Sequence, residues 1–79
     1  AISALGALTE AGRDVPGDVA VIGYDDVTLA AHTAPALTTI RQDLVTGTAL
    51  MVDALLRRIA GEPVDSAIVA PQLIVRAST

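Results

Sequence analysis

The chain lacks cysteine altogether, which excludes disulfide bonds, thiolate metal sites and cysteine nucleophiles. It also lacks tryptophan and phenylalanine, and Tyr24 is its one aromatic residue, so any core is built from Ala, Val, Leu and Ile. Such an aliphatic composition suits helices packed on a sheet. With 79 residues the chain forms at most one small domain, whose core is thin because short chains bury a smaller fraction of their surface.

Lysine is absent as well: all five basic residues are arginines, scattered along a chain of net charge −4. An acidic chain without a basic stripe binds the phosphate backbone poorly, because nucleic-acid affinity comes largely from basic side chains that displace counterions. The sequence therefore predicts no direct contact of this chain with DNA.

The chain has no long apolar segment: its longest apolar run is far shorter than the roughly 18 residues that span a bilayer. No basic segment precedes an apolar one as in a signal peptide. The chain also contains no GxSxG, no phosphate-binding P-loop and no HExxH. We therefore expect no membrane segment, no catalytic residue, no metal and no cofactor.

The residues that are present predict an α/β alternation. Gly12 ends a first amphipathic helix, Asp43 is a credible N-cap of a longer one, and Pro71 marks an edge strand or a bend. The expected elements are a helix over 1–11, a type II turn over 15–18, a strand over 19–23, a helical turn over 27–31, a strand over 37–42, a helix from 44 to Gly61, and extended chain over 66–77.

Two of these elements carry expectations about burial. The strand over 19–23 is continuously apolar, as a parallel strand covered on both faces would be. The longer helix has a core stripe of Leu44, Thr48, Met51 or Val52, Leu55 and Ile59, whereas Asp53 and Arg57 form an exposed i,i+4 pair.

The stretch VIGYDD places Asp25 and Asp26 directly after the first strand. Ligands of open α/β sheets bind beyond the carboxyl ends of the strands, and a carboxylate accepts hydrogen bonds from two vicinal hydroxyls or from ring N–H groups. Alternatively, both aspartates cap the short helical turn that starts near Val27, and the local sequence leaves the two interpretations equal. A metal site is disfavoured, since hard cations recruit more oxygen ligands than this segment offers.

Tyr24 and His32 flank this stretch. Tyr24 either contacts a ligand or covers the end of the sheet, and packing is the simpler interpretation from the residues alone. His32 has no serine, cysteine or second histidine at ligand spacing, so we expect a packing or interface histidine.

The order VPGDVAVIGYDD, PALTTIRQD, ALLRRIAGEP and APQLIVRAST closely resembles the C-terminal part of the lactose/galactose repressor (LacI/GalR) family of bacterial transcription regulators, over residues 1–79. The resemblance implies a fragment of a type I periplasmic-binding-protein-like fold, with a parallel sheet and flanking helices. It further implies that 1–41 and 72–79 belong to a C-terminal subdomain and 42–71 to an N-terminal one.

The resemblance also implies a function. The chain would be the effector-sensing, dimerising part of a cytoplasmic repressor that binds a small sugar-like ligand and reaches operator DNA only through an N-terminal DNA-binding domain absent here. Asp25 would contact the effector with Tyr24 beside it, and Asp26 would cap the following turn. The chain would pair as a homodimer or a higher homo-oligomer, and the residues expected at the dimer interface are Ile2, Leu5, His32 and Thr33.

Three rival functions remain at this point. A periplasmic sugar-binding transport protein shares the fold and cleft chemistry, and an upstream signal peptide rather than a helix-turn-helix would identify it. A phosphoacceptor receiver domain also has an acidic pair at a strand end, but its site requires a lysine. The third is a structural fragment without independent activity.

The predicted strands belong to two subdomains, which leaves open sheet edges and an apolar helix face. We therefore expect the excised 79-residue chain to be poorly stable as a monomer, or to associate. Chemical unfolding at several protein concentrations checks this. A sharp, concentration-independent transition of a monomeric species would contradict it.

Overall fold

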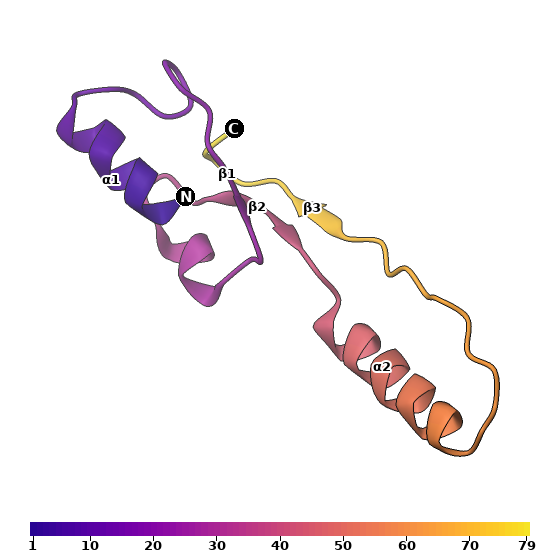
Figure 1. The fold of residues 1–79 in the computed structure, drawn as a ribbon. Helices are drawn as coiled ribbons and strands as arrows, with labels where there is room; N and C mark the ends of the chain where they lie inside the picture. The colour runs from indigo at the N-terminus through magenta and orange to yellow at the C-terminus, as the bar shows by residue number, and fades with distance from the viewer. The chain divides into compact units, whose positions relative to one another are not determined.

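The computed structural model describes residues 1–79 and contains two α-helices, a short 3₁₀ helix and three strands (Figure 1). Their order is the order predicted from the sequence. The elements are α1 (Ile2–Glu10), β1 (Ile22–Tyr24), η1 (Thr28–His32), β2 (Thr38–Arg41), α2 (Leu44–Ile59) and β3 (Gln72–Ile74).

The three strands form one sheet in the order β1-β2-β3. β1 pairs with β2 in parallel, with Gly23 opposite Thr39. β3 runs antiparallel to β2, with Gln72 opposite Arg41. The α/β class is thus confirmed, but the sheet is mixed rather than purely parallel. β3 follows Pro71 and lies at the edge of the sheet, where a preceding proline is tolerated.

β1 is shorter than the predicted strand over 19–23. Its ladder begins at Ile22, and the N–H of Val21 donates instead to the carbonyl of Ser78 at 3.0 Å. The expectation of two covered faces is wrong for this chain: Gly23 is buried, whereas Ile22 and Tyr24 on the opposite face are exposed. The core residues contributed by α1 and η1 cover one face of the sheet only.

Both α-helices end as their glycines predict. Gly12 has φ +70° and Gly61 has φ +79°, the left-handed conformation that glycine adopts without a steric penalty. In α1 the N–H of Arg13 donates to the carbonyl of Leu8 at 2.9 Å, which completes a Schellman motif. These bonds pair carbonyl groups that the last helical turn would otherwise leave unpaired.

Asp43 is the N-cap of α2, as predicted, and its carboxylate accepts from the N–H of Thr46 at 3.0 Å. The Thr46 hydroxyl and this N–H together lower the pKa of Asp43. Further along the helix, Arg57 and Asp53 form the expected exposed ion pair at 3.0 Å.

The turn over 15–18 is not of type II. A type II turn requires a positive φ at Gly17, but in this chain only Gly12 and Gly61 among the glycines have one. The loop is closed instead from Asp14, whose carbonyl accepts the N–H of Asp18 at 2.9 Å. The Asp18 carboxylate in turn accepts the N–H of Asp14 at 2.8 Å, a pair of bonds that sequence patterns for four-residue turns do not include.

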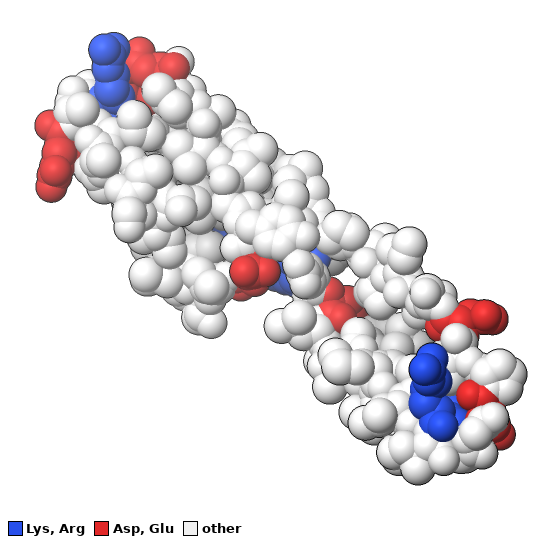
Figure 2. Space-filling view, viewed as in Figure 1, with Lys and Arg blue, Asp and Glu red and all other residues white.

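The chain divides into two compact units, residues 1–41 with 72–79, and residues 42–71. In the second unit, α2 has no buried residue, and the expected stripe lies open, with Met51 69% exposed. The prediction that this stripe lies in a core is therefore wrong within this chain. Figure 2 shows charged side chains at a few separate places and a largely uncharged surface between them.

The core of the first unit consists of Leu5 on α1, Ala30 on η1 and Leu37 before β2, with Ile2, Val15 and Val21 packed against it. Figure 1 shows α1 and η1 on the same side of β1. A core of this size leaves little tolerance for changes in side-chain volume.

Gly23 is a test of this packing. A Cβ added at Gly23 would lie 2.8 Å from Cδ2 of Leu37 and 3.3 Å from Cβ of Ala1. We expect Gly23→Ala to lower the free energy of unfolding of the complete protein by about 1 to 3 kcal/mol through overpacking, as measured by urea unfolding.

Gly6→Ala is the matched control, because a Cβ at Gly6 meets nothing within 4 Å. Alanine is favoured over glycine inside a helix by about 0.5 to 1 kcal/mol, so this control should leave stability unchanged or raised. Equal losses in the two variants would contradict the packing argument.

Candidate functional site

The chain turns sharply where β1 ends. Asp25 has φ +82° and Asp26 has φ +44°, a left-handed conformation that costs a non-glycine residue of the order of 1 to 3 kcal/mol. The N–H of Asp25 donates to the carbonyl of Ile40 at 2.8 Å, and the N–H of Asp26 donates to Oγ1 of Thr39 at 3.2 Å. Bonds to β2 therefore hold both residues in this conformation.

The carboxylate of Asp26 is bound by two arginines. Oδ2 accepts from Nε of Arg41 at 2.7 Å and lies 2.7 Å from its Nη2, while Oδ1 accepts from Nη1 of Arg76 at 2.8 Å. The Asp26 side chain is only 8% exposed. The hydrogen bond from Arg76, followed by that from Arg41, lowers the pKa of Asp26.

Asp26 is therefore not a helix cap. The N-cap of η1 is Val27, and no side chain caps this helix. The expectation that Asp26 caps the following turn is wrong because its carboxylate is already occupied by arginines 15 and 50 residues further along the chain.

A second, uncharged network ties the C-terminal tail to the sheet. The hydroxyl of Ser78 donates to the carbonyl of Val21 at 2.6 Å and accepts the N–H of Thr38 at 2.8 Å. Oγ1 of Thr38 accepts the N–H of Arg76 at 2.8 Å. Thr38 and Ser78 are fully buried. The sequence motifs LTT and RxST thus have a structural role that the pattern alone did not reveal, although buried hydroxyls require partners.

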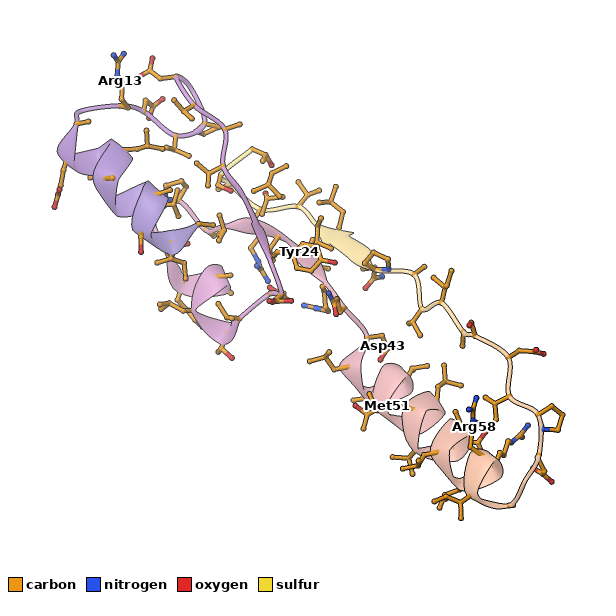
Figure 3. The ribbon with its side chains drawn as sticks, in the orientation of Figure 1. Arg13, Tyr24, Asp43, Met51 and Arg58 are labelled. Carbon is orange, nitrogen blue, oxygen red and sulfur yellow. The ribbon has the colours of Figure 1, made fainter.

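The environment of Asp25 differs from that of the arginine-bound Asp26. Asp25 is exposed, and its carboxylate forms no hydrogen bond or ion pair within the chain. Tyr24, the preceding residue, is also exposed and projects from the end of β1 (Figure 3). A carboxylate with two accepting oxygens can bind hydroxyl donors, and an aromatic ring beside it offers apolar contact. This pair can therefore bind part of a polar, hydroxyl-rich ligand.

A hollow of about 380 Å³ lies beside the site, lined by residues of α1, β1, η1 and β2 that include Tyr24, Val27 and Thr39. Neither Asp25 nor Asp26 lines it. No group of three or more His, Asp or Glu side chains lies close enough to bind a metal ion. Asp25 is thus an exposed polar residue at the end of β1 that lies outside the lining of this hollow.

The residues expected at a subunit interface divide into two groups. Leu5 is 5% exposed and belongs to the core of the chain, so its side chain is not available to a partner subunit. Ile2 is partly buried, His32 is exposed at the end of η1, and the Thr33 hydroxyl donates to the carbonyl of Pro35 at 2.9 Å.

The sequence pattern of the periplasmic binding protein-like domain family matches residues 1–79. The chain belongs to this family of α/β ligand-binding domains. No helix of the structure is long and apolar enough to cross a membrane.

Relatives of this chain include transcriptional regulators. The chain is 43% identical to an uncharacterised HTH-type transcriptional regulator of Streptomyces limosus and 41% identical to the HTH-type transcriptional regulator MalR of Streptomyces coelicolor, over its whole length in both cases. It covers 23% and 24% of these proteins. The chain therefore spans about a quarter of the length of the relatives it matches.

Solved structures agree with this relationship. The transcriptional regulator CelR in complex with cellobiose superposes with a TM-score of 0.88 at 39% identity, covering 99% of this chain and 24% of that one. A lac repressor dimer bound to operator and the anti-inducer ONPF superposes with a TM-score of 0.92 at 36% identity, covering 100% and 28%. The recognition of a LacI-type regulator from the sequence is thereby confirmed.

The lowered pKa of Asp26 predicts an acid-sensitive contribution to stability. A carboxylate whose pKa is lower in the folded state stabilises the fold fully above its unfolded pKa, and this contribution is lost as the pH falls through the folded-state value. For Asp26 the loss begins near the ordinary value of 3.8. In the complete protein, the unfolding free energy should therefore fall less steeply below this pH in Asp26→Asn than in the wild type.

Urea unfolding at a series of acidic pH values measures this difference. Asp53→Asn is the control, because it removes an exposed pair with Arg57, which is worth little, and it should follow the wild-type pH dependence. Parallel curves for the wild type and Asp26→Asn would show that the arginine pairs do not contribute in this way.

Proposed function

We propose that this chain is the effector-sensing and subunit-pairing part of a bacterial transcriptional repressor, and not an enzyme. In this proposal the complete protein binds a small sugar-like ligand, and this ligand controls the binding of the protein to operator DNA. The family match and the regulators among the relatives support it. Further support comes from one similar structure that contains cellobiose and another that contains operator DNA.

The observation that carries the proposal is the contrast between two adjacent carboxylates. Asp26 is neutralised by Arg41 and Arg76 and is closed to a ligand. Asp25 stands exposed at the carboxyl end of β1 without a partner in the chain, at the edge of the sheet where ligands of open α/β folds bind. Asp25 is therefore the proposed effector contact, with Tyr24 beside it.

The two compact units correspond, in this proposal, to the two subdomains of a periplasmic-binding-protein-like fold. Residues 1–41 and 72–79 form part of the C-terminal subdomain, and residues 42–71 form part of the N-terminal one. An effector that binds one state of the complete protein more tightly than the other shifts a pre-existing equilibrium between DNA-binding and released states. Operator contact is made by a separate DNA-binding domain, in the cytoplasm.

Subunit pairing is proposed to use Ile2 at the start of α1 with His32 and Thr33 at the end of η1. These residues are exposed or partly buried in the first unit, whereas Leu5 is left out because it belongs to the core.

The alternative function is that of a periplasmic transport protein, which shares the fold and the chemistry of the ligand cleft. A helix-turn-helix or a signal peptide in the sequence before Ala1 of the complete protein decides between the two.

Asp25→Asn in the complete protein tests the effector contact. Loss of a charged hydrogen bond that becomes buried by the ligand should weaken binding by about 2 to 5 kcal/mol. Isothermal titration calorimetry with cellobiose first, followed by a panel of other mono- and disaccharides, measures the affinity. The expected result is a large loss of affinity with an unchanged unfolding midpoint.

Glu10→Gln provides the matched control, since it neutralises another exposed carboxylate, on α1. It should bind the same sugar as the wild type does. If Asp25→Asn and Glu10→Gln bind that sugar with equal affinity, Asp25 does not belong to the effector site.

A further inference from the structure

Two consecutive non-glycine residues, Asp25 and Asp26, lie in the left-handed region, and their N–H groups are bound by Ile40 and Thr39 of β2. We propose that Asp26, Thr39 and Arg41 form a clamp that holds Asp25 in its left-handed conformation and so presents its carboxylate to the effector. Asp26 and Arg41 are then positioning residues for the sensor. The presentation of Asp25 to an effector rests on the proposed function, whereas the clamp itself does not.

The geometry of Asp26 supports this role. Its N–H is bound by Thr39 and its two carboxylate oxygens are bound by Arg41 and Arg76, so the residue is fixed at its backbone and at the tip of its side chain. Asp25 lies between this fixed residue and β1, and its own N–H is bound to Ile40. With both neighbours anchored, the backbone of Asp25 cannot relax to an extended conformation without breaking one of these contacts.

The position of Arg41 extends the argument to the rest of the molecule. Arg41 is the last residue of the first unit before the chain leaves it, and Gln72 is the first residue after its return. The two residues pair across β2 and β3. The clamp thus connects the proposed effector contact to the point where both chain connections between the units start. A ligand bound to Asp25 would therefore contact a residue whose backbone is hydrogen-bonded to β2, the strand that ends at Arg41.

The two arginines bound to Asp26 differ in exposure, which makes the clamp testable. The Arg76 side chain is 17% exposed and its Nη1 also donates to the carbonyl of Leu37 at 2.9 Å, so Arg76 is part of the packed structure. The Arg41 side chain is 51% exposed. Arg41→Gln therefore removes one contact of the clamp and leaves the ion pair of Asp26 with Arg76 in place. This variant tests the clamp even if Asp26→Asn does not fold.

A stability cycle tests the clamp without a ligand. Glycine adopts a positive φ without a steric penalty, so Asp25→Gly relieves strain only where the clamp enforces it. In the complete protein, Asp25→Gly should lower the unfolding equilibrium constant, and it should do so by a larger factor in the wild type than in the Arg41→Gln background. The expected difference is about two- to tenfold, as for residues in contact. The effect of glycine on the unfolded chain cancels in this cycle.

An affinity cycle tests the positioning role. With cellobiose, or the sugar from the panel that the wild type binds, Arg41→Gln should lower affinity about tenfold in the wild type but less than about twofold in the Asp25→Asn background. A residue with a merely structural role lowers affinity equally in both backgrounds. Arg57→Gln is the control, since it removes a comparable exposed pair with Asp53, and should change neither cycle.

The outcomes separate the two proposals. A stability cycle without coupling overturns the clamp, whatever the affinities. Coupling in stability together with equal affinity losses in both backgrounds overturns the positioning role. If the wild-type protein binds none of the sugars, the proposed function fails, while the stability cycle still decides whether the clamp exists.

Discussion

The carboxylate of Asp26 joins three segments that are far apart in the sequence. It binds Arg41 at the end of β2 and Arg76 after β3 from the turn that follows β1. Ser78 does the same with uncharged groups, since it connects Val21 and Thr38. The core has only three buried hydrophobic residues. A wrong register would leave buried polar groups unpaired at a cost of about 1 to 3 kcal/mol each. The polar networks therefore specify which strands pair, where the apolar core alone is too small to do so.

The same ion pairs explain how two adjacent aspartates coexist in a tight turn. Neighbouring carboxylates repel each other, and here two guanidinium groups compensate the charge of the Asp26 carboxylate. The Asp25 residue beside it is exposed. In the proposed site, the exposed oxygens of Asp25 are those that hydroxyl donors can reach.

The sequence predicted those parts of the structure that are set by local interactions. Gly12 and Gly61 end the helices and Asp43 caps α2 because each acts within one helical turn. The apolar pattern of the first strand predicted a parallel strand, and β1 pairs with β2 in parallel across a connection that contains η1. The role of Asp26 could not be predicted in this way, since its partners lie 15 and 50 residues away, and a carboxylate before a helical turn has the same sequence as a cap. The family resemblance singled out Asp25 as an effector contact, but it did not reveal what holds Asp25 in place.

Burial was the least predictable property, for a related reason. An apolar stripe indicates that a face is covered, but not which part of a protein covers it. Tyr24 pairs with Ile40, and Ile40 pairs with Leu73, so the exposed Tyr24 and Leu73 share one open face of the sheet. The helix α2 is open as well.

These two open faces belong to different units. The clamp around Asp25, in contrast, is complete within the first unit. The contacts that hold the backbone of Asp25 and Asp26 are therefore all made by residues of this one unit.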